Sequence, residues 1–207
     1  MTISATSQGL KPGVVTSSNR PANPFDGMMI YETDTNLVRI WNGAAWKTLA
    51  YSDYTSGSVI QVVSTTKTDT FSTQSTSLVD ITGMSATITP TSTSSSVLVM
   101  VNMKWANNNN YSSRVILLRG STNIGGGTPS GNRPAAIAGA TSTSIGADSG
   151  TTIYLDSPAT TSATTYKLQV ALDNGNGTFY LNSTNSDTDN VSRPRFASTI
   201  TLMEIAG

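Results

Sequence analysis

Apolar and polar residues alternate along short stretches of this chain, most regularly in residues 97–105, Val-Leu-Val-Met-Val-Asn-Met-Lys-Trp. One face of this run carries Val97, Val99, Val101, Met103 and Trp105. A period of two residues is that of a β-strand, and the second face changes from apolar to polar along the run. The pattern therefore predicts a strand that begins buried on both faces and ends near solvent. Residues 196–205 alternate in the same way and predict a closing strand.

The second part of the chain predicts shorter strands of the same kind, and no stretch of it predicts a helix. These strands are expected at residues 59–63, 69–72, 78–81, 85–89, 111–119, 152–155, 166–172 and 178–181. Four consecutive asparagines, 107–110, predict a turn that pairs the strands on either side. Asp-Asn-Gly-Asn-Gly at 173–177 predicts a tight hairpin. Residues 120–150, rich in Gly, Ala, Ser and Thr, are either an irregular excursion or a set of weak edge strands.

The fold class expected from these patterns is all-β, with a sandwich of two antiparallel sheets over residues 58–207. Residues 21–50 predict a small β-meander, in which Asn42-Gly43 is the strongest hairpin signal. Its strands are expected at residues 28–33, 37–41 and 45–49. Residues 1–20 predict an extended arm, with a loose tail as the alternative. Residues 51–57 lack periodicity and predict a linker between the two parts.

The predicted meander is too small to be stable by itself, because two or three short strands cannot bury enough apolar surface to offset chain entropy. It nevertheless holds two of the three Trp in the chain. We therefore expect another subunit or a larger assembly to cover Ile30, Ile40, Trp41 and Trp46. Phe25 and Met28 complete the predicted contact set.

Two motifs in this stretch carry a resemblance: Pro-x-x-Pro-x-x-Gly-x-x-Ile-Tyr-x-Thr-Asp-Thr at residues 21–35 and Trp-Asn-Gly-x-x-Trp at residues 41–46. Together they resemble a module near the start of tailed-bacteriophage virion proteins, namely tail fibres, head fibres and small surface proteins. The resemblance implies a small β unit that attaches a trimeric fibre or assembles it. The predicted sandwich resembles, in architecture alone, the jelly rolls of tumour-necrosis-factor-like trimers, which recur as outer knobs of phage fibres.

The amino-acid composition excludes several kinds of functional site. The 207 residues include no Cys and no His, and 12 basic residues balance 12 acidic ones. Disulfides, Cys/His zinc sites and a His general base are excluded, and a neutral chain without a basic run gives no basis for binding nucleic acid. No apolar segment approaches the length that crosses a bilayer, so we expect no membrane insertion. Residues 1–10 lack the features of a signal peptide, which predicts assembly in the host cytoplasm.

Candidate sites are few. The chain has only two glutamates, Glu32 and Glu204, and most of its aspartates occupy turn positions, so we expect no enzyme and no cofactor. Asp187 and Asp189 carry oxygens suited to Ca²⁺, as does the 173–177 turn, but neither matches an EF-hand and solvated loops are favoured. A possible host-glycan loop comprises Asn107, Asn108, Asn109, Asn110 and Tyr111, although turn formation explains the asparagines better.

These observations favour a non-enzymatic bacteriophage structural protein at the virion surface. The leading hypothesis is a homotrimeric capsid decoration or head-fibre protein, since the short linker leaves no room for the long shaft of a tail fibre. Its expected partners are itself and other phage structural proteins, such as the major capsid protein or tail components. The alternative is a short tail fibre or receptor-binding protein that adsorbs to a host-surface glycan.

Overall fold

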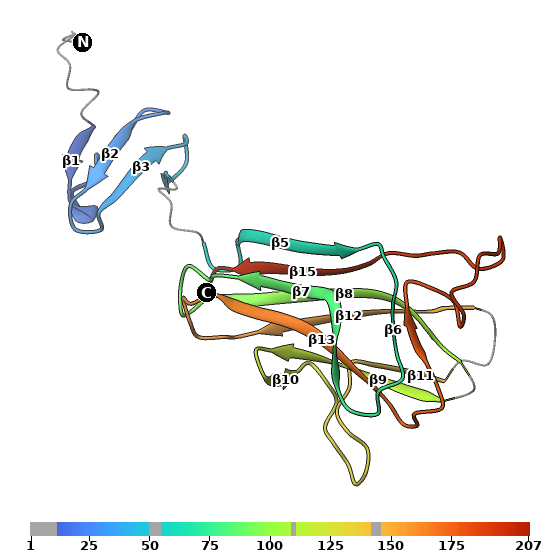
Figure 1. Ribbon diagram of the computed structural model, residues 1–207. Helices are drawn as coiled ribbons and strands as arrows, with labels where there is room; N and C mark the ends of the chain where they lie inside the picture. The colour runs from blue at the N-terminus through green and yellow to red at the C-terminus, as the bar shows by residue number, and fades with distance from the viewer. Residues whose placement is uncertain (1–11, 50–54, 109–110, 142–145) are drawn as a thin grey trace. The chain divides into compact units, whose positions relative to one another are not determined.

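The structure is a computed structural model, which describes residues 12–49, 55–108, 111–141 and 146–207. Within these ranges the chain is built of β-strands and one short 3-10 helix, which confirms the predicted all-β class. It divides between Tyr54 and Thr55 into two compact units, each treated below by itself (Figure 1).

The N-terminal unit is a four-stranded sheet in the order β1-β2-β3-β4. Its strands are β1 (Gly13–Val15), β2 (Met29–Glu32), β3 (Leu37–Trp41) and β4 (Trp46–Thr48). The β2-β3-β4 meander is antiparallel, as predicted. The sequence did not predict that β1 pairs with β2 in parallel, so the described part of the expected arm belongs to the sheet. The connection from β1 to β2 contains the 3-10 helix η1 (Ser17–Asn19).

The hairpin between β3 and β4 follows the predicted turn chemistry. The side-chain Oδ1 of Asn42 accepts hydrogen bonds from the backbone N–H groups of Ala44, at 3.2 Å, and Ala45, at 2.9 Å. Gly43 has φ of 88°, a left-handed conformation that costs glycine little. The Trp-Asn-Gly-x-x-Trp motif thus sets Trp41 and Trp46 directly opposite each other.

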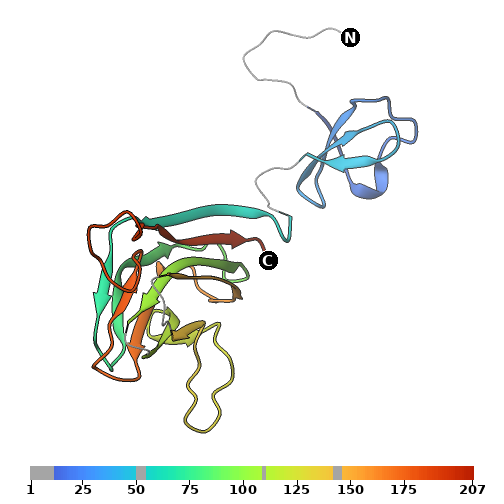
Figure 2. The same ribbon diagram turned by 90° about the vertical axis from the view of Figure 1, so that its right-hand side faces the viewer.

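The C-terminal unit is a sandwich of two sheets (Figure 1 and Figure 2). The first sheet has the order β5-β15-β8-β12, and β14 and β6 extend it beyond the start of β15. Its strands are β5 (Val59–Lys67), β15 (Ser198–Ile205), β8 (Ser96–Asn107), β12 (Asp148–Asp156), β14 (Phe179–Leu181) and β6 (Phe71–Thr73). The second sheet has the order β7-β13-β9, with β10 and β11 both paired to β9. Its strands are β7 (Val79–Ile88), β13 (Thr164–Leu172), β9 (Ser112–Arg119), β10 (Thr122–Ile124) and β11 (Ala138–Thr141).

The pairing of the main strands is nested. The first strand, β5, pairs with the last, β15, and β7 pairs with β13. Inside these pairs β8 pairs with β12, and β9 pairs with β10 and β11. Antiparallel strands nested in this way over two sheets form a jelly roll, so the predicted architecture of residues 58–207 is confirmed.

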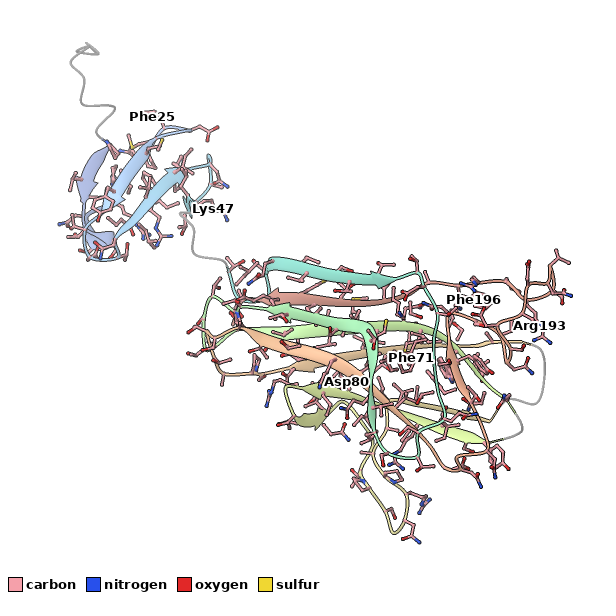
Figure 3. All side chains as sticks on the ribbon, viewed as in Figure 1. Phe25, Lys47, Phe71, Asp80, Arg193 and Phe196 are labelled. Atoms are coloured by element: carbon pink, nitrogen blue, oxygen red, sulfur yellow. The ribbon has the colours of Figure 1, made fainter. Side chains whose placement is uncertain are left out.

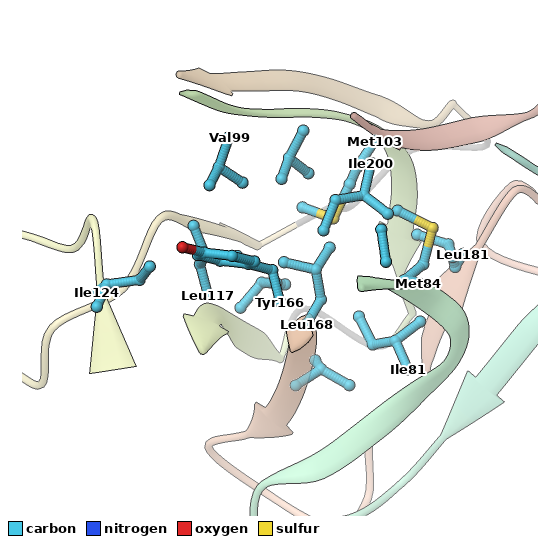
Figure 4. Close-up of a cluster of buried hydrophobic side chains, with 14 of the residues drawn as sticks. Ile81, Met84, Val99, Met103, Leu117, Ile124, Tyr166, Leu168, Leu181 and Ile200 are labelled. Carbon is cyan, nitrogen blue, oxygen red and sulfur yellow. The ribbon is translucent and has the colours of Figure 1, made fainter. Parts of the chain in front are cut away.

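The core lies between the two sheets (Figure 4). The alternation predicted for β8 is confirmed, because its five inward side chains are all less than 5% exposed. Val99, Met103 and Ile200 from the first sheet face Leu117 and Leu168 from the second.

Two predicted hairpins are wrong. Residues 111–119 do not return beside β8, because β8 lies in the first sheet and β9 in the second. Likewise the 173–177 turn does not pair β13 with β14, since β14 pairs with β6 and β8. Asn and Gly mark where a chain reverses, but in a jelly roll the reversed chain passes to the opposite sheet.

An ion pair joins the two sheets at one end of the core. Arg119 on β9 donates from Nη1 to both carboxylate oxygens of Asp156 on β12, each at 2.9 Å. The Tyr166 hydroxyl on β13 donates to the same carboxylate at 2.7 Å. Asp156 is 4% exposed and Tyr166 is fully buried, and burial followed by the Asp156 contact raises the pKa of Tyr166 far above its ordinary value. The tyrosine therefore stays a hydrogen-bond donor.

We predict that Asp156→Asn destabilises the sandwich by about 2 kcal/mol, because a charged hydrogen-bonding partner of Arg119 and Tyr166 is lost in a buried setting. Asp80→Asn is the matched control, since Asp80 makes the same kind of pair with Lys167 at an exposed position and its loss is expected to cost less than about 1 kcal/mol. Chemical denaturation of the full chain measures both. Equal losses for the two variants would contradict the prediction.

Candidate functional site

The two faces of the N-terminal sheet follow from its register. Side chains alternate along each strand, and directly paired residues point to the same face. One face carries Ile30, Glu32, Arg39, Trp41 and Trp46. The other carries Val14, Met29, Tyr31, Val38, Ile40 and Lys47, and is called the open face below.

The first face is largely buried within the unit. Ile30 is 2% exposed, so it needs no cover from another chain and the expectation that it does is wrong. Trp41 and Trp46 are half-buried and pack edge to face, with ring centroids 5.6 Å apart and an interplanar angle of 62°. An aromatic pair of this geometry contributes about 1 kcal/mol beyond its buried area.

A buried carboxylate fixes the β1–β2 connection to this face. Glu32 is fully buried and accepts hydrogen bonds from Arg20 Nε at 2.5 Å, Thr35 Oγ1 at 2.8 Å and Arg39 Nε at 3.1 Å. The Arg20 hydrogen bond does most to hold the pKa of Glu32 below its ordinary value, against the opposing effect of burial. The group is therefore charged at neutral pH, and it joins the connection, the β2–β3 turn and β3.

The Ile-Tyr-x-Thr-Asp-Thr motif has a structural explanation. Asp34 accepts hydrogen bonds from the backbone N–H of Ser17, at 2.9 Å, and from the Ser17 hydroxyl. The Ser17 contacts lower the pKa of Asp34. Thr33 donates from its backbone N–H to the carbonyl of Val15 at 2.9 Å. These contacts and the Glu32 cluster hold the first strand and its connection on the meander.

The open face is mostly apolar, with Lys47 as its charged side chain, and much of it is exposed. Val14 is 51% exposed and Met29 is 44% exposed, while Tyr31, Val38 and Ile40 are half-buried. Within the unit, the Glu32 cluster holds the β1–β2 connection to the opposite face. A contiguous apolar surface of this kind is typical of a contact with another protein chain.

The structure distributes the six predicted contact residues over different surfaces. Ile40 lies on the open face, whereas Ile30, Trp41 and Trp46 lie on the opposite face. Phe25, in the β1–β2 connection, is 65% exposed (Figure 3), and Met28 is half-buried. Sequence reasoning missed the remaining open-face residues: Val14, Met29, Tyr31, Val38 and Lys47. Val14-Val15 was the available signal for β1.

The predicted glycan loop is partly structural. Asn107 is fully buried and donates from Nδ2 to Ser113 Oγ at 3.0 Å, so it offers no surface to a ligand. Asn108 Oδ1 accepts a hydrogen bond from the backbone N–H of Thr178 at 2.7 Å. Tyr111 is half-buried against the core, and Asn109 and Asn110 lie outside the described residues.

A hollow lies instead in the loop between β14 and β15, and Figure 3 labels Arg193 in this loop. Its lining residues are Asp187, Thr188, Asp189, Asn190, Arg193 and Arg195. Arg195 Nη2 contacts Asp187 at 3.0 Å, and Arg193 Nη1 donates to Asn185 Oδ1 at 2.9 Å. The sequence pointed to Asp187 and Asp189 as possible calcium ligands but not to the two arginines. Carboxylates and guanidinium groups together suit hydrogen bonding to a polar ligand such as a glycan.

Within the described ranges, no cluster of three or more acidic, His or Cys side chains could hold a metal ion. The same residues contain no helix with the length and apolarity needed to span a bilayer.

Comparison with known families finds a match at the start of the chain. Residues 1–59 match the family described as the phage tail like trimerisation region. The matched part includes the whole β1–β4 sheet and ends at the first residue of β5. The match supports a phage tail-like protein that self-associates as a homotrimer.

The chain is also similar to two solved virus structures. One is the structure of the infectious bursal disease virus Gx strain, at 14% identity and a TM-score of 0.35. The other is the infectious bursal disease virus VP2 subviral particle, at 11% identity and a TM-score of 0.31. Each match covers 80% of this chain and 45% of the other, so the chain spans less than half the length of those proteins. Likenesses this weak carry no argument here. No curated protein matches the chain.

We predict that acid loosens the N-terminal unit through Glu32. A group whose pKa is lower in the folded state stabilises the fold above its ordinary pKa, which is 4.5 for this residue, and the contribution is lost as the pH falls through the folded-state value. Glu32→Gln should weaken the unit at neutral pH and remove this acid-dependent loss. The circular dichroism of the coupled Trp41–Trp46 pair reports the unit during acid titration. Asp26→Asn, at an exposed position in the same unit, is the control. Its circular dichroism signal should be lost over the same pH range as that of the parent chain.

Proposed function

We propose that this protein is a non-enzymatic structural component of a bacteriophage virion surface, in which three copies associate through their N-terminal units. The observation that carries the proposal is the open face, a largely apolar surface within the segment that matches a trimerisation region. In this arrangement the N-terminal unit attaches the trimer to capsid or tail proteins, and the jelly roll is a knob displayed on the particle.

The two glutamates support a non-enzymatic role. Glu32 is held by the two arginines, and Glu204 is fully buried in the jelly roll. Burial alone would raise the pKa of Glu204, but hydrogen bonds from Gln61, at 2.6 Å, and from Thr91, at 2.7 Å, outweigh it and the pKa is lowered. Neither carboxylate is free to act on a substrate, because each is fully buried and already bonded.

Sedimentation of the purified full chain tests the proposal. We expect a species of three times the 21.6 kDa chain mass. Met29→Asp, which places a charge on the open face, should shift the chain to monomers, because a desolvated unpaired carboxylate in the contact is costly.

Val191→Asp is the matched control: Val191 is an exposed apolar residue of the jelly roll, outside the matched segment, and its replacement should leave the trimer intact. A monomeric parent chain would overturn the proposal. Dissociation by both variants would show that the open face has no special part in it.

A short tail fibre that binds a host glycan is the second candidate. Two observations favour it: the matched family is tail-like, and the β14–β15 loop offers a hollow lined by both charged groups and amides. The first candidate, a capsid decoration protein, needs no such ligand site.

Phage carrying Arg193→Ala separates these two functions. A receptor-binding role predicts at least a tenfold loss of adsorption with unchanged particle stability, since guanidinium contacts to a ligand are worth about 1.4 kcal/mol or more. A decoration role predicts normal adsorption. Arg133→Ala, another surface arginine in a jelly-roll loop, is the control for general effects of charge loss.

A further inference from the structure

The outer face of the first jelly-roll sheet carries a second apolar surface. The register places Leu155, Leu98, Met203 and Val62 in one row across β12, β8, β15 and β5. Ile153 and Met100 begin the next row, and Ile205 pairs with Val59 at the end of the sheet. These residues are called the sheet patch: Val59, Val62, Leu98, Met100, Ile153, Leu155, Met203 and Ile205.

The most exposed side chains of the sheet patch lie on its two edge strands. Ile153 and Leu155 on β12 are 62% and 56% exposed, and Val59 and Val62 on β5 are 52% and 55% exposed. The residues between them on β8 and β15 are half-buried by their neighbours. Leucine, isoleucine and valine contribute to stability only where water is removed from them, so this surface gains from being covered.

The rest of the same face is polar and internally bonded. Ser64 and Thr201 share a hydrogen bond of 2.8 Å across β5 and β15, and Asn102 Nδ2 donates to Thr151 Oγ1 at 3.0 Å across β8 and β12. Across the described strands of this face, Lys104 is the only charged side chain, and it bonds to Ser149 at the polar end. The apolar end therefore has no charged side chain that would bind water strongly or form an ion pair with a ligand.

The opposite sheet differs. Its outer face carries Asp80, which accepts hydrogen bonds from Lys167 at 2.9 Å and Gln169 at 2.7 Å, and the pair Thr87–Thr165. The Gln169 and Lys167 hydrogen bonds lower the pKa of Asp80. A charged, hydrogen-bonded face of this kind is typical of a surface in water. The two faces of one sandwich are thus unequal, and the first has the more exposed apolar side chains.

The occupant that fits the sheet patch is a second copy of the same chain. The match to a trimerisation region runs to residue 59, and Val59 is itself a member of the sheet patch. Chains joined in a trimer hold their neighbouring domains at an effective concentration in the millimolar range, so even a modest apolar contact between them forms. A partner that was charged or polar would find no complementary group on this end of the sheet.

Threefold symmetry also fits the position of the exposed residues. Around a threefold axis each copy contacts both neighbours, and the contact is heterologous, so one edge of a surface meets the other edge of the next copy. The sheet patch has exposed apolar residues at both edges, on β5 and on β12. We propose that the sheet patch is a second contact of the trimer, in which Val59 and Val62 of one jelly roll pack against Ile153 and Leu155 of the next. This inference rests on the homotrimer of the proposed function.

Disulfide crosslinking of the full chain tests the contact, because the natural sequence has no cysteine to interfere. Within one chain Val62 and Leu155 lie three strand spacings apart, about 14 Å, whereas a disulfide needs Cα atoms within about 7 Å. The double variant Val62→Cys, Leu155→Cys can therefore crosslink only between chains. We expect a covalent trimer on a non-reducing gel, and no covalent trimer from either single variant, since one cysteine makes one bond.

The matched control is Ser85→Cys, Asn123→Cys. These exposed residues end the row Ser85, Lys167, Leu118, Asn123 across the opposite sheet and have the same separation in strands. This variant should give no covalent trimer. A chain that sediments as a trimer but is not crosslinked through residues 62 and 155, or is crosslinked equally through the control pair, overturns this inference alone. A parent chain that sediments as a monomer overturns the proposed function and the inference with it.

Discussion

The N-terminal unit depends on one buried charge. Three short antiparallel strands cannot hold together in water by apolar burial alone. Here Glu32 is fully buried under Arg20 and Arg39, and the guanidinium of Arg20 brings the β1–β2 connection onto the sheet. Removing one partner from such a cluster leaves a desolvated, unpaired charge. The fold of the unit therefore requires all members of the cluster together. With one face closed in this way, the other face remains available for a partner chain.

Much of the fold could be predicted from local patterns. The alternation of residues 97–105 and 196–205 identified two central strands and, for residues 97–105, the buried face. A period of two is expected when side chains point alternately to the two faces of a strand. The hairpin errors at 107–110 and 173–177 have one cause. Turn residues specify a reversal but not which sheet receives the returning strand, and in a jelly roll that is decided by core packing between residues far apart in the sequence.

The candidate site was harder to predict than the fold. The sequence pointed to Trp41 and Trp46 because they are large, yet they pack against each other on the face opposite the open face. The most exposed apolar residues of the open face are Val14 and Met29, for which there was no special signal in the sequence. β1 has three residues and pairs in parallel, so no hairpin signal announces it. The Ser/Thr-rich composition likewise concealed the one apolar end of a sheet among many polar ones.

The proposed contacts would respond little to dissolved salt, because the sheet patch has no charged side chain and the open face has one, Lys47. Contacts between ions weaken as dissolved salt screens them, over distances of about 10 Å at 0.1 M. Joints made of valine, leucine, isoleucine and methionine have no such charge to screen, and exclusion of salts such as sulfate tends to strengthen them. In the proposed trimer, contacts of this kind would hold in both dilute and concentrated salt.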